Sequence, residues 1–503
     1  MKKRYYITCA IDYANGLPHL GHAIEKIGGD AMARYYRRKG AVVHFVVGMD
    51  EHGLKVMQSA AAENITPQQW VDNIAASFKS TWQRLNISFD DFIRTTEPRH
   101  RRAVETMIER MAKSGDFYKA KYEGYYCVGC EAFKRQDELI SVAGVHVCPI
   151  HPTRQIAWSE EENWFFRLSR YQDRLLKLIN ERPEFIQPEV RRNEIRKVIE
   201  SGLEDISVSR ARLPWGIPWP GEAGTSVYVW IDALTNYLTA AGFPDEHYRD
   251  YWPADWHVIG KDITRFHCVY WPAMLMSADV ELPRSVWGHG FITFGGSKLS
   301  KSENVRVELD DAIERHGPDA LRYFLLKDIP WNGDGEFSWE RFDERYTADL
   351  ANNFGNLANR AISMIERYRD GVVPRGKPTR LDEDIAGAVV RYRSAMDENL
   401  LHQGAAIVME LSSLANGFVE EQAPWSLAKD PQAAERLDDV LGALARVVAS
   451  LCALLEPFAP GKMAELAPRL GLEGVPLLDD VARLDLAGLR VQRGSVLFPK
   501  PAS

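Results

Sequence analysis

Cysteines are few in this chain, and long apolar runs are absent. The 503 residues include six cysteines, three clustered and three scattered, which is typical of a protein kept in a reducing cytoplasm. The longest apolar candidate, Val447 to Leu455, has nine residues, whereas a membrane span requires roughly 18. The N-terminus is basic but carries no sustained apolar segment. We therefore expect a cytoplasmic protein without a signal peptide or a membrane span.

An excess of positive charge is also lacking. The formal net charge is −8, which argues against indiscriminate binding to nucleic acid, so any RNA contact must come from local basic and aromatic surface. No internal repeat or low-complexity tract is evident. With 45% hydrophobic and 26% charged residues, the composition is that of a globular protein. The length allows about two to four domains with full cores.

A short strand followed by a helix opens the chain. The aromatic and β-branched run Tyr5–Thr8 predicts a buried strand, and a turn at Asn15–Gly16 leads into a helix from His19 to about Lys39. His19 and His22 would be neighbours on the first turn, where free N–H groups and the helix dipole favour a phosphate. On this segment alone, the histidines could equally be helix-start residues beside a Gly turn.

A lysine–serine loop far along the chain favours the phosphate interpretation. Lys298 and Lys301 stand three apart in KLSKS and would offer two mobile ammonium groups to a triphosphate that is being split. A solvated loop is the alternative for this segment by itself. Together, HLGH at 19–22 and KLSKS at 298–302 resemble the HIGH and KMSKS signatures of the class I aminoacyl-tRNA synthetases.

Four residues with metal-ligand spacing lie between these two segments. Cys127-x2-Cys130 is followed after seventeen residues by Cys148-x2-His151. Two ligand pairs with this spacing are typical of a zinc knuckle. Four protein ligands would leave no open position on the metal, so the zinc would be structural. The alternative is four unrelated residues.

Strands alternate with helices on both sides of the cysteine region. The apolar run Val42–Val47 predicts a strand, after which Asp50 is either a helix cap or a partner for a substrate ammonium group. The alternating run Val227–Asp232 predicts another strand. A further strand ends at Gly260, and a Gly followed by Asp262 at such a position commonly receives a ribose.

After about residue 340, the pattern becomes helical. Asp349–Tyr368, Asp382–Asn416 and Leu437–Leu455 are long periodic stretches that predict a helix bundle. Trp425 stands in a helix break, where an aromatic side chain is less often plain core than in the middle of an apolar stripe. The last stretch, 489–500, alternates and would form either a strand or a tail.

Seven segments carry a closer resemblance, to the methionyl-tRNA synthetase family, over essentially the whole length: CAIDYANGLPHLGH, VGMDEHG, YVWIDAL, VIGKDITRFH, KLSKS, NNFGNLANR and EQAPW. The resemblance implies an α/β fold whose Rossmann-type nucleotide-binding parallel sheet is split by a zinc-binding connective insertion and followed by an α-helical bundle. The implied domains are the first Rossmann half at 1–116, the connective zinc knuckle at 117–225, the second Rossmann half at 226–299, the KLSKS loop and stem-contact region at 300–345, and the anticodon-binding domain with its C-terminal tail at 346–503.

The same resemblance implies an activity and its site residues. Methionine and ATP would form methionyl-adenylate and pyrophosphate, and methionine would then pass to the 3′ end of tRNA(Met), for translation initiation and elongation. Mg²⁺ would accompany the ATP, and one structural Zn²⁺ would bind each chain. The implied residues are His19, His22, Lys298 and Lys301 for catalysis; Gly21, Gly260, Asp262, Lys298 and Lys301 for ATP; Ile11, Tyr13, Asp50, Trp230, Leu234, Tyr237, Ile263, Phe266 and His267 for methionine; Cys127, Cys130, Cys148 and His151 for zinc; and Asn356, Arg360, Pro424 and Trp425 for the anticodon.

Two departures and two alternatives accompany this resemblance. The knuckle resembles the single-zinc form of the family, and no residues remain for the C-terminal dimerising domain of some relatives, so a monomer is expected. A leucyl-, isoleucyl- or valyl-specific synthetase would need a large hydrolytic insertion, for which the connective region leaves no room. A non-catalytic RNA-binding copy would be expected to have lost a signature histidine or lysine, and all four are present.

Overall fold

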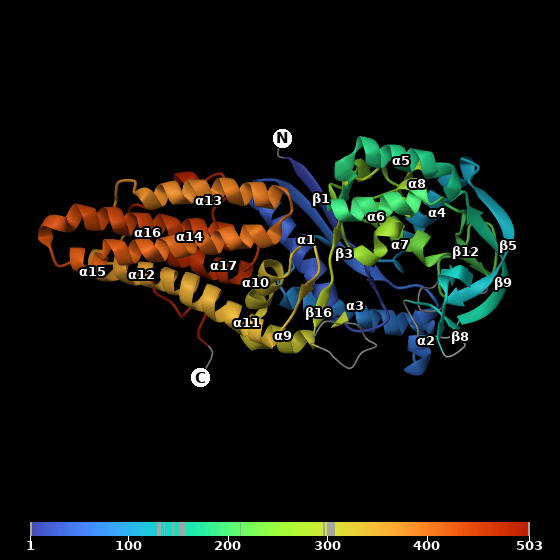
Figure 1. Ribbon diagram of the computed structural model, residues 1–503, viewed down its shortest axis with the longest axis horizontal. Helices are drawn as coiled ribbons and strands as arrows, with labels where there is room; N and C mark the ends of the chain where they lie inside the picture. The colour runs from blue at the N-terminus through green and yellow to red at the C-terminus, as the bar shows by residue number, and fades with distance from the viewer. Residues whose placement is uncertain are drawn as a thin grey trace.

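The computed structural model describes residues 3–127, 132–134, 136–142, 145–149, 156–211, 213–294, 297–298 and 307–500. Figure 1 shows an elongated molecule in which a sheet lies between two ends of different character. The long strands β5 (Phe117–Cys127) and β9 (Ile156–Phe166) lie at one end, and a group of long helices lies at the other. The sheet between them positions the candidate site.

Seven strands form this central sheet, and every pairing in it is parallel. Its order is β10-β15-β14-β1-β3-β2, and β4 also pairs with β3. The strands are β1 (Arg4–Cys9), β2 (Asp12–Tyr13), β3 (Val42–Asp50), β4 (Asp91–Arg94), β10 (Ile186–Gln187), β14 (Trp256–Gly260) and β15 (Ser285–His289). Because parallel strands end at a common edge, the residues that follow β1, β3, β14 and β15 meet there.

Helices connect and cover these strands. The first, α1 (Leu20–Arg38), packs on β1, β3 and β14, and its glycines at 28 and 29 leave room for Trp331 and Cys9. The other helices of this part are α2 (Leu54–Ala62), α3 (Pro67–Arg84), α4 (Pro98–Lys113), α7 (Val229–Ala241), a π-helical turn at Phe266–Tyr270 and α8 (Trp271–Ser277).

The strand predicted at Val227–Asp232 is wrong. β13 (Thr225–Val227) ends just before α7, which is helical from Val229 onward. Every residue of α7 except Trp230 is buried, so its apolar residues form no one-sided stripe, and a short apolar run of this kind cannot be told from a strand by periodicity.

The chain between β4 and α7 adds an antiparallel sheet. β5 and β9 pair over their full length, and β6 and β11 flank them in the order β11-β9-β5-β6. A short strand of this stretch, β10, joins the edge of the parallel sheet beside β15. The other elements are β6 (Ala132–Lys134), β7 (Ile140–Val142), β8 (Val145–Val147), α5 (Gln172–Glu181), α6 (Glu189–Glu200), β11 (Ile206–Ser207) and β12 (Ser209–Ala211).

A small sheet and several helices follow β15. The sheet contains β16 (Ile292–Phe294), β17 (Ser297–Lys298) and β18 (Gly335–Glu336). The helices are α9 (Leu309–His316), α10 (Pro318–Asp328), α11 (Trp339–Arg345) and a π-helical segment at Tyr346–Gly355. Arg322 of α10 is fully buried and pairs with Asp30 of α1 at 2.7 Å, which joins this part to the central sheet layer.

The remaining helices pack against one another at the end of the molecule opposite β5 and β9 (Figure 1). They are α12 (Asn356–Arg369), α13 (Arg380–Asp397), α14 (Leu401–Gln422), α15 (Pro424–Leu427), α16 (Ala434–Leu455) and α17 (Pro460–Arg469). The single helical stretch predicted at Asp382–Asn416 is wrong, because Asn399 adopts φ 56° and separates α13 from α14. Residues 489–500 form a tail with one isolated bridge.

Within the described part of the chain, no helix combines the length and the apolar character needed to cross a membrane.

Candidate functional site

Two histidines cap the first turn of α1. His19 is the N-cap residue, and its Nδ1 accepts a hydrogen bond from the Gly21 N–H at 3.1 Å. Nδ1 of His22 accepts from the His19 N–H at 3.3 Å, and the two rings stack with centroids 3.7 Å apart. Because Nδ1 is the acceptor in both rings, their neutral forms carry the proton on Nε2. Each ring can therefore offer an Nε2–H donor to an anion at the helix N-terminus.

Gly21 and Gly260 lie where a side chain would collide with predicted ligand-binding groups. A Cβ at Gly21 would lie 2.9 Å from Cε1 of the His19 ring. Gly260 is the last residue of β14, and a Cβ there would lie 2.7 Å from Oδ1 of Asp262. Asp262 itself is exposed. These two glycines thus let the histidine and the carboxylate lie close to the backbone at the edge of the sheet.

The residues predicted to bind the methionine side chain form an aromatic group around α7. The rings of Trp230 and Phe266 stack with centroids 3.6 Å apart and planes 6° apart. Nδ1 of His267 donates to the Ile263 carbonyl at 3.0 Å, so its Nε2 accepts from the Tyr237 hydroxyl at 2.6 Å. Burial lowers the pKa of His267 to about 4, which keeps the ring neutral at physiological pH. The ring therefore presents an uncharged surface to a buried ligand.

One apolar cluster contains or contacts the rest of this predicted set. Leu234 and Tyr237 are 1% exposed and belong to the cluster, while the partly buried members pack against it. Those partly buried residues are Ile11, Tyr13, Trp230, Ile263 and Phe266. Asp50 ends β3 directly opposite Tyr13 of β2, and the N-cap of α2 is Gly53. Asp50 is thus not a helix cap, and it lies at the same sheet edge as the aromatic group.

The lysine loop and the cysteine region fall partly outside the described residues. Lys298 ends β17 opposite Thr293, but its side chain and Lys301 are not described. Cys130 and His151 also lie outside the described residues. Among the residues that the structure does describe, no group of three or more His, Cys, Asp or Glu side chains could hold a metal.

The two remaining cysteines of the predicted knuckle stand at the ends of strands from two different sheets. Cys127, the last residue of β5, and Cys148, just after β8, are both buried. Tyr125 and His146, two residues before them, have ring centroids 6.2 Å apart. The strands therefore bring both cysteines to the same region of the molecule.

Two of the predicted anticodon residues, Arg360 and Trp425, lie next to each other where α14 gives way to α15. The guanidinium of Arg360 lies 5.9 Å from the ring centroid of Trp425 and pairs with Glu420 at 2.7 Å. Trp425 is 38% exposed, so it is not a core residue, and Asn356, one turn before Arg360, is exposed too. Pro424 is buried at the first position of α15. The structure thus brings Arg360 and Trp425 together at the surface.

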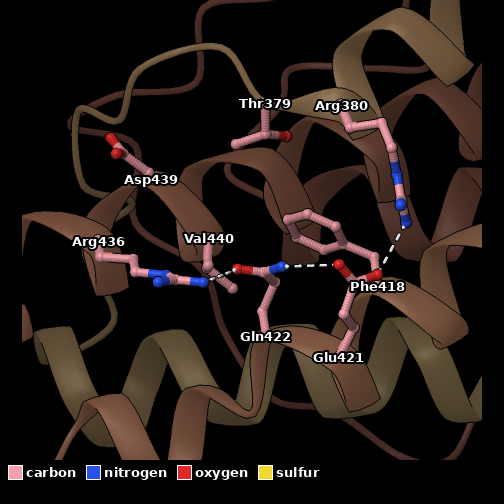
Figure 2. A pocket seen from close by; sticks show the side chains of 8 residues that line it. All are labelled: Thr379, Arg380, Phe418, Glu421, Gln422, Arg436, Asp439 and Val440. Carbon is pink, nitrogen blue, oxygen red and sulfur yellow. Dashed lines mark hydrogen bonds and ion pairs between the residues drawn. The ribbon is translucent and has the colours of Figure 1, made fainter.

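A polar cavity of about 280 Å³ lies at the same end of α14 (Figure 2). Nη2 of Arg436 donates to Oε1 of Gln422 at 3.1 Å, and Nη2 of Arg380 donates to Oε2 of Glu421 at 3.0 Å. The lining residues are Thr379, Arg380, Phe418, Glu421, Gln422, Arg436, Asp439 and Val440. Two arginines and two carboxylates balance in charge, so the cavity offers both hydrogen-bond donors and acceptors.

Comparisons with known proteins identify the family. The family model described as tRNA synthetases class I (M) matches residues 5–155 and 145–362. The methionine–tRNA ligase of Bacillus subtilis is 42% identical and aligns with 99% of this chain and 78% of its own length. The chain belongs to the class I methionyl-tRNA synthetase family. Another family member, the methionine–tRNA ligase of Brucella suis, is 44% identical over 92% of this chain and 91% of its own length.

Solved structures of the family agree with this assignment. The Mycobacterium tuberculosis methionyl-tRNA synthetase in complex with methionyl-adenylate superposes with a TM-score of 0.95 at 40% identity. The alignment covers 99% of this chain and 100% of the other. The apo form of that synthetase superposes with a TM-score of 0.89 at 36% identity. The α/β core with its parallel sheet is therefore the class I synthetase fold.

A buried ion pair that the sequence did not predict joins two of the family motifs. Nδ1 of His52, from VGMDEHG, donates to Oδ2 of Asp232, from YVWIDAL, at 2.6 Å. Nε2 of His100 on α4 donates to Oδ1 of the same carboxylate at 2.7 Å. Asp232 therefore fixes α7, which carries the aromatic group, against the end of β3. The sequence signal that could have indicated this ion pair is the single carboxylate of Asp232 inside an apolar run.

A second buried cluster lies beneath the α1 histidines. Lys26 is 1% exposed, and its Nζ donates to the Ala10 carbonyl at 2.8 Å, to Oδ1 of Asp12 at 2.7 Å and to Oε1 of Glu25 at 2.9 Å. The sequence signal for this cluster is the adjacent pair Glu25 and Lys26 within the apolar pattern of α1. The sequence alone does not show which side chains pair with them.

Proposed function

We propose that this chain charges tRNA(Met) with methionine in two steps. The observation that carries the proposal is the meeting, at one edge of the parallel sheet, of a capped helix N-terminus and a group of packed aromatic side chains. The first suits a nucleotide phosphate, and the second suits an unbranched thioether side chain. The likeness to a synthetase that was solved with methionyl-adenylate supports the same pairing of ligands.

Activation requires positioning and charge stabilisation more than proton transfer. A methionine carboxylate oxygen attacks the α-phosphorus of ATP, the bond to the bridging oxygen breaks, and pyrophosphate leaves. His19 and His22 donate their Nε2–H groups to phosphate oxygens on which negative charge develops, and Lys298 and Lys301 reach the same oxygens from the KLSKS loop. Mg²⁺ would accompany the ATP and would offset part of the charge of its phosphates.

Recognition of methionine follows from the shape and neutrality of the pocket. Trp230 and Phe266 form a flat wall, and the Tyr237–His267 pair forms another, so a polarizable sulfur finds ring edges within contact distance. Asp50 receives the substrate ammonium group, which needs a carboxylate partner when it is desolvated. Gly260 and Asp262 receive the ribose of ATP. The ring of His267, neutral by virtue of its low pKa, avoids placing a charge beside the thioether.

The connective region, which we take as 117–225, holds one structural zinc through Cys127, Cys130, Cys148 and His151. The burial of Cys127 and Cys148 after β5 and β8, next to the contacting rings of Tyr125 and His146, supports this ligand set. The donor chemistry fits Zn²⁺, because three thiolates and one imidazole would complete a tetrahedral shell.

In the second step, a ribose hydroxyl at the 3′ end of tRNA(Met) attacks the carbonyl carbon of the adenylate, and AMP leaves. The helical end of the molecule reads the anticodon through Asn356, Arg360, Pro424 and Trp425. The exposed ring of Trp425 with its neighbouring guanidinium supports this role, because unpaired bases stack on such groups.

The test is ATP–pyrophosphate exchange with each of the twenty amino acids in turn. We expect methionine alone to support rapid exchange. Exchange with isoleucine, leucine or valine at a comparable kcat/KM would assign a different specificity, and no exchange with any amino acid would contradict an enzymatic role.

A further inference from the structure

The buried side chain of Lys26 connects two parts of the site that carry different substrates in the proposed function. Its Nζ bonds the Ala10 carbonyl, just after β1, and the Asp12 carboxylate in β2. Ala10 and Asp12 flank Ile11, and Asp12 immediately precedes Tyr13. Ile11 and Tyr13 are both proposed to bind methionine. Lys26 itself stands on α1, whose first turn carries the histidines assigned to ATP.

Helix geometry places Lys26 on the same face of α1 as those histidines. His19, His22 and Lys26 are related by spacings of three and four residues, which align on one face. Near its middle and end, α1 is held by other contacts: Arg34 pairs with Glu456 at 2.7 Å, and Asp30 pairs with Arg322 of α10 at 2.7 Å. The segment 10–13 has fewer such anchors, because β2 is only two residues long.

The charges around Lys26 make its removal costly. Oδ2 of Asp12 is buried and has no hydrogen-bond partner among the described residues, so Oδ1 with Lys26 carries the stabilisation of that carboxylate. Glu25 faces Lys26 through Oε1 at 2.9 Å, and its Oε2 lies 3.3 Å from Nε2 of His289 on β15. Burial already raises the pKa of Asp12 to about 7, so without the ammonium group this carboxyl would take up a proton, and β2 would lose its ion pair with α1.

We propose that Lys26 is a positioning residue for methionine binding: by holding Ala10 and Asp12 against α1, it fixes Ile11 and Tyr13 where the amino acid binds. The inference rests on the proposed function. Loss of Lys26 leaves α1 with its other anchors and releases the segment 10–13, so methionine binding suffers and ATP binding does not.

The experiment measures KM for methionine, KM for ATP and kcat in pyrophosphate exchange for Lys26→Met, Asp12→Ala and the double variant. Lys26→Met should raise KM for methionine about tenfold or more, the effect of losing hydrogen bonds to a charged group. KM for ATP should stay within about twofold. The double variant should be no worse than Lys26→Met, because both changes remove the same contact.

Two further variants make the outcome decisive. Asp12→Asn keeps an oxygen acceptor for Lys26 and should retain most of the methionine affinity. Arg34→Met removes a partly buried cation of α1 that also has two carboxylate partners but is remote from the site. It should lower the melting temperature and leave KM for methionine unchanged. If Lys26→Met fails to fold, the comparison of KM for methionine between Asp12→Ala and Asp12→Asn tests the proposal instead.

The proposal is overturned if folded Lys26→Met or Asp12→Ala binds methionine as the wild type does. It is also overturned if the two variants raise both KM values alike, as a general loss of stability would. The wild-type protein tests the proposed function separately. If the wild type catalyses methionine-dependent pyrophosphate exchange and the variants have wild-type KM values for methionine, the proposed function stands and only the proposal for Lys26 is overturned.

Discussion

At the scale of single residues, Asp232 shows how a buried carboxylate can join two elements of the candidate site. Burial alone would raise its pKa, but His52 and His100 outweigh that effect and lower the pKa of Asp232 to about 2. Burial would likewise lower the pKa of His52, yet the facing carboxylate raises it. Both pKa shifts favour the charged forms of these two side chains, which pair between the end of β3 and α7.

Asp232→Asn should lower the free energy of unfolding by about 3 kcal/mol near pH 5.5, because it leaves a buried partner unpaired. The contribution of Asp232 to the free energy of unfolding is present above its ordinary pKa of 3.8 and is lost as the pH falls toward its lowered pKa of about 2. The share due to His52 is full below its ordinary pKa of 6.5 and is lost as the pH rises through its raised pKa. When unfolding by denaturant is measured across pH, the free energies of the wild type and Asp232→Asn should therefore differ most between the ordinary pKa values of Asp232 and His52.

The exposed pair of Asp245 with Arg102 provides the matched control. Asp245→Asn should change the free energy of unfolding by less than about 1 kcal/mol. A difference for Asp232→Asn that is equally small, or that grows below about pH 3, would contradict the charged pair.

At the scale of elements, the packing of α1 reverses a rule that holds for isolated helices. Replacing a helical Gly by Ala is usually stabilising by about 0.5–1 kcal/mol. A Cβ at Gly28 would lie 2.0 Å from Cη2 of Trp331, whose ring stacks on His289. Gly387 of α13 has nothing within 4 Å of its Cβ position.

Gly28→Ala should therefore destabilise the protein by about 1–3 kcal/mol through overpacking, whereas Gly387→Ala should stabilise it. The measurement is the melting temperature of both variants and of the wild type under the same conditions. Melting temperatures that rise in both would mean that Trp331 moves freely and that α1 is not closely packed there.

Elements whose burial is one-sided or whose boundaries carry turn signals could be predicted from sequence. The helix that starts at His19 was found because Asn15–Gly16 precedes it and its apolar residues recur at helical spacing. The strand predicted at Val227–Asp232 failed because α7 is buried on nearly all sides, which removes the period. The break at Asn399 was missed because one residue in the left-handed region interrupts an otherwise continuous pattern.

Within the site, motif residues were predictable and their supporting contacts were not. His19, His22 and Trp230 stand in recognisable segments. The pairing of Asp12 with Lys26, or of Asp232 with His100, depends on which segments the sheet brings together. Local sequence patterns do not contain that long-range information, although the buried charges themselves are visible in apolar runs.

The connective region offers a test of the metal proposal. Purified protein should contain one zinc per chain, and Cys130→Ser should lose it and melt at a lower temperature, since structural zinc contributes to the folding free energy. Cys452→Ser, which changes a buried cysteine of α16, should retain the metal. Wild-type protein without zinc, and equally stable in chelator, would refute the knuckle.

At the scale of the whole molecule, the proposal assigns chemistry and tRNA identity to separate parts. The predicted ATP and methionine residues Gly260, Asp262 and Asp50 lie at the edge of the parallel sheet, whereas Trp425 lies in the helical group at one end (Figure 1). Pyrophosphate exchange needs only the first part, and aminoacylation needs both.

Trp425→Ala should reduce kcat/KM for tRNA in aminoacylation by the equivalent of about 1–3 kcal/mol, the stacking energy of one base. Exchange without tRNA should remain near the wild-type rate, and the melting temperature should change little because the ring is partly exposed. Trp158→Ala, an exposed tryptophan of β9, is the control and should leave both activities intact. Equal losses in both assays with a lower melting temperature would make Trp425 a structural residue.

A single-turnover experiment tests the central claim most directly. The protein is incubated with labelled methionine, ATP and Mg²⁺, freed of small molecules, and then mixed with tRNA(Met). The account predicts about one methionyl-adenylate per chain before mixing and transfer of the label to the 3′ end of the tRNA afterwards. Absence of a bound adenylate, or an adenylate that tRNA(Met) does not discharge, would contradict it.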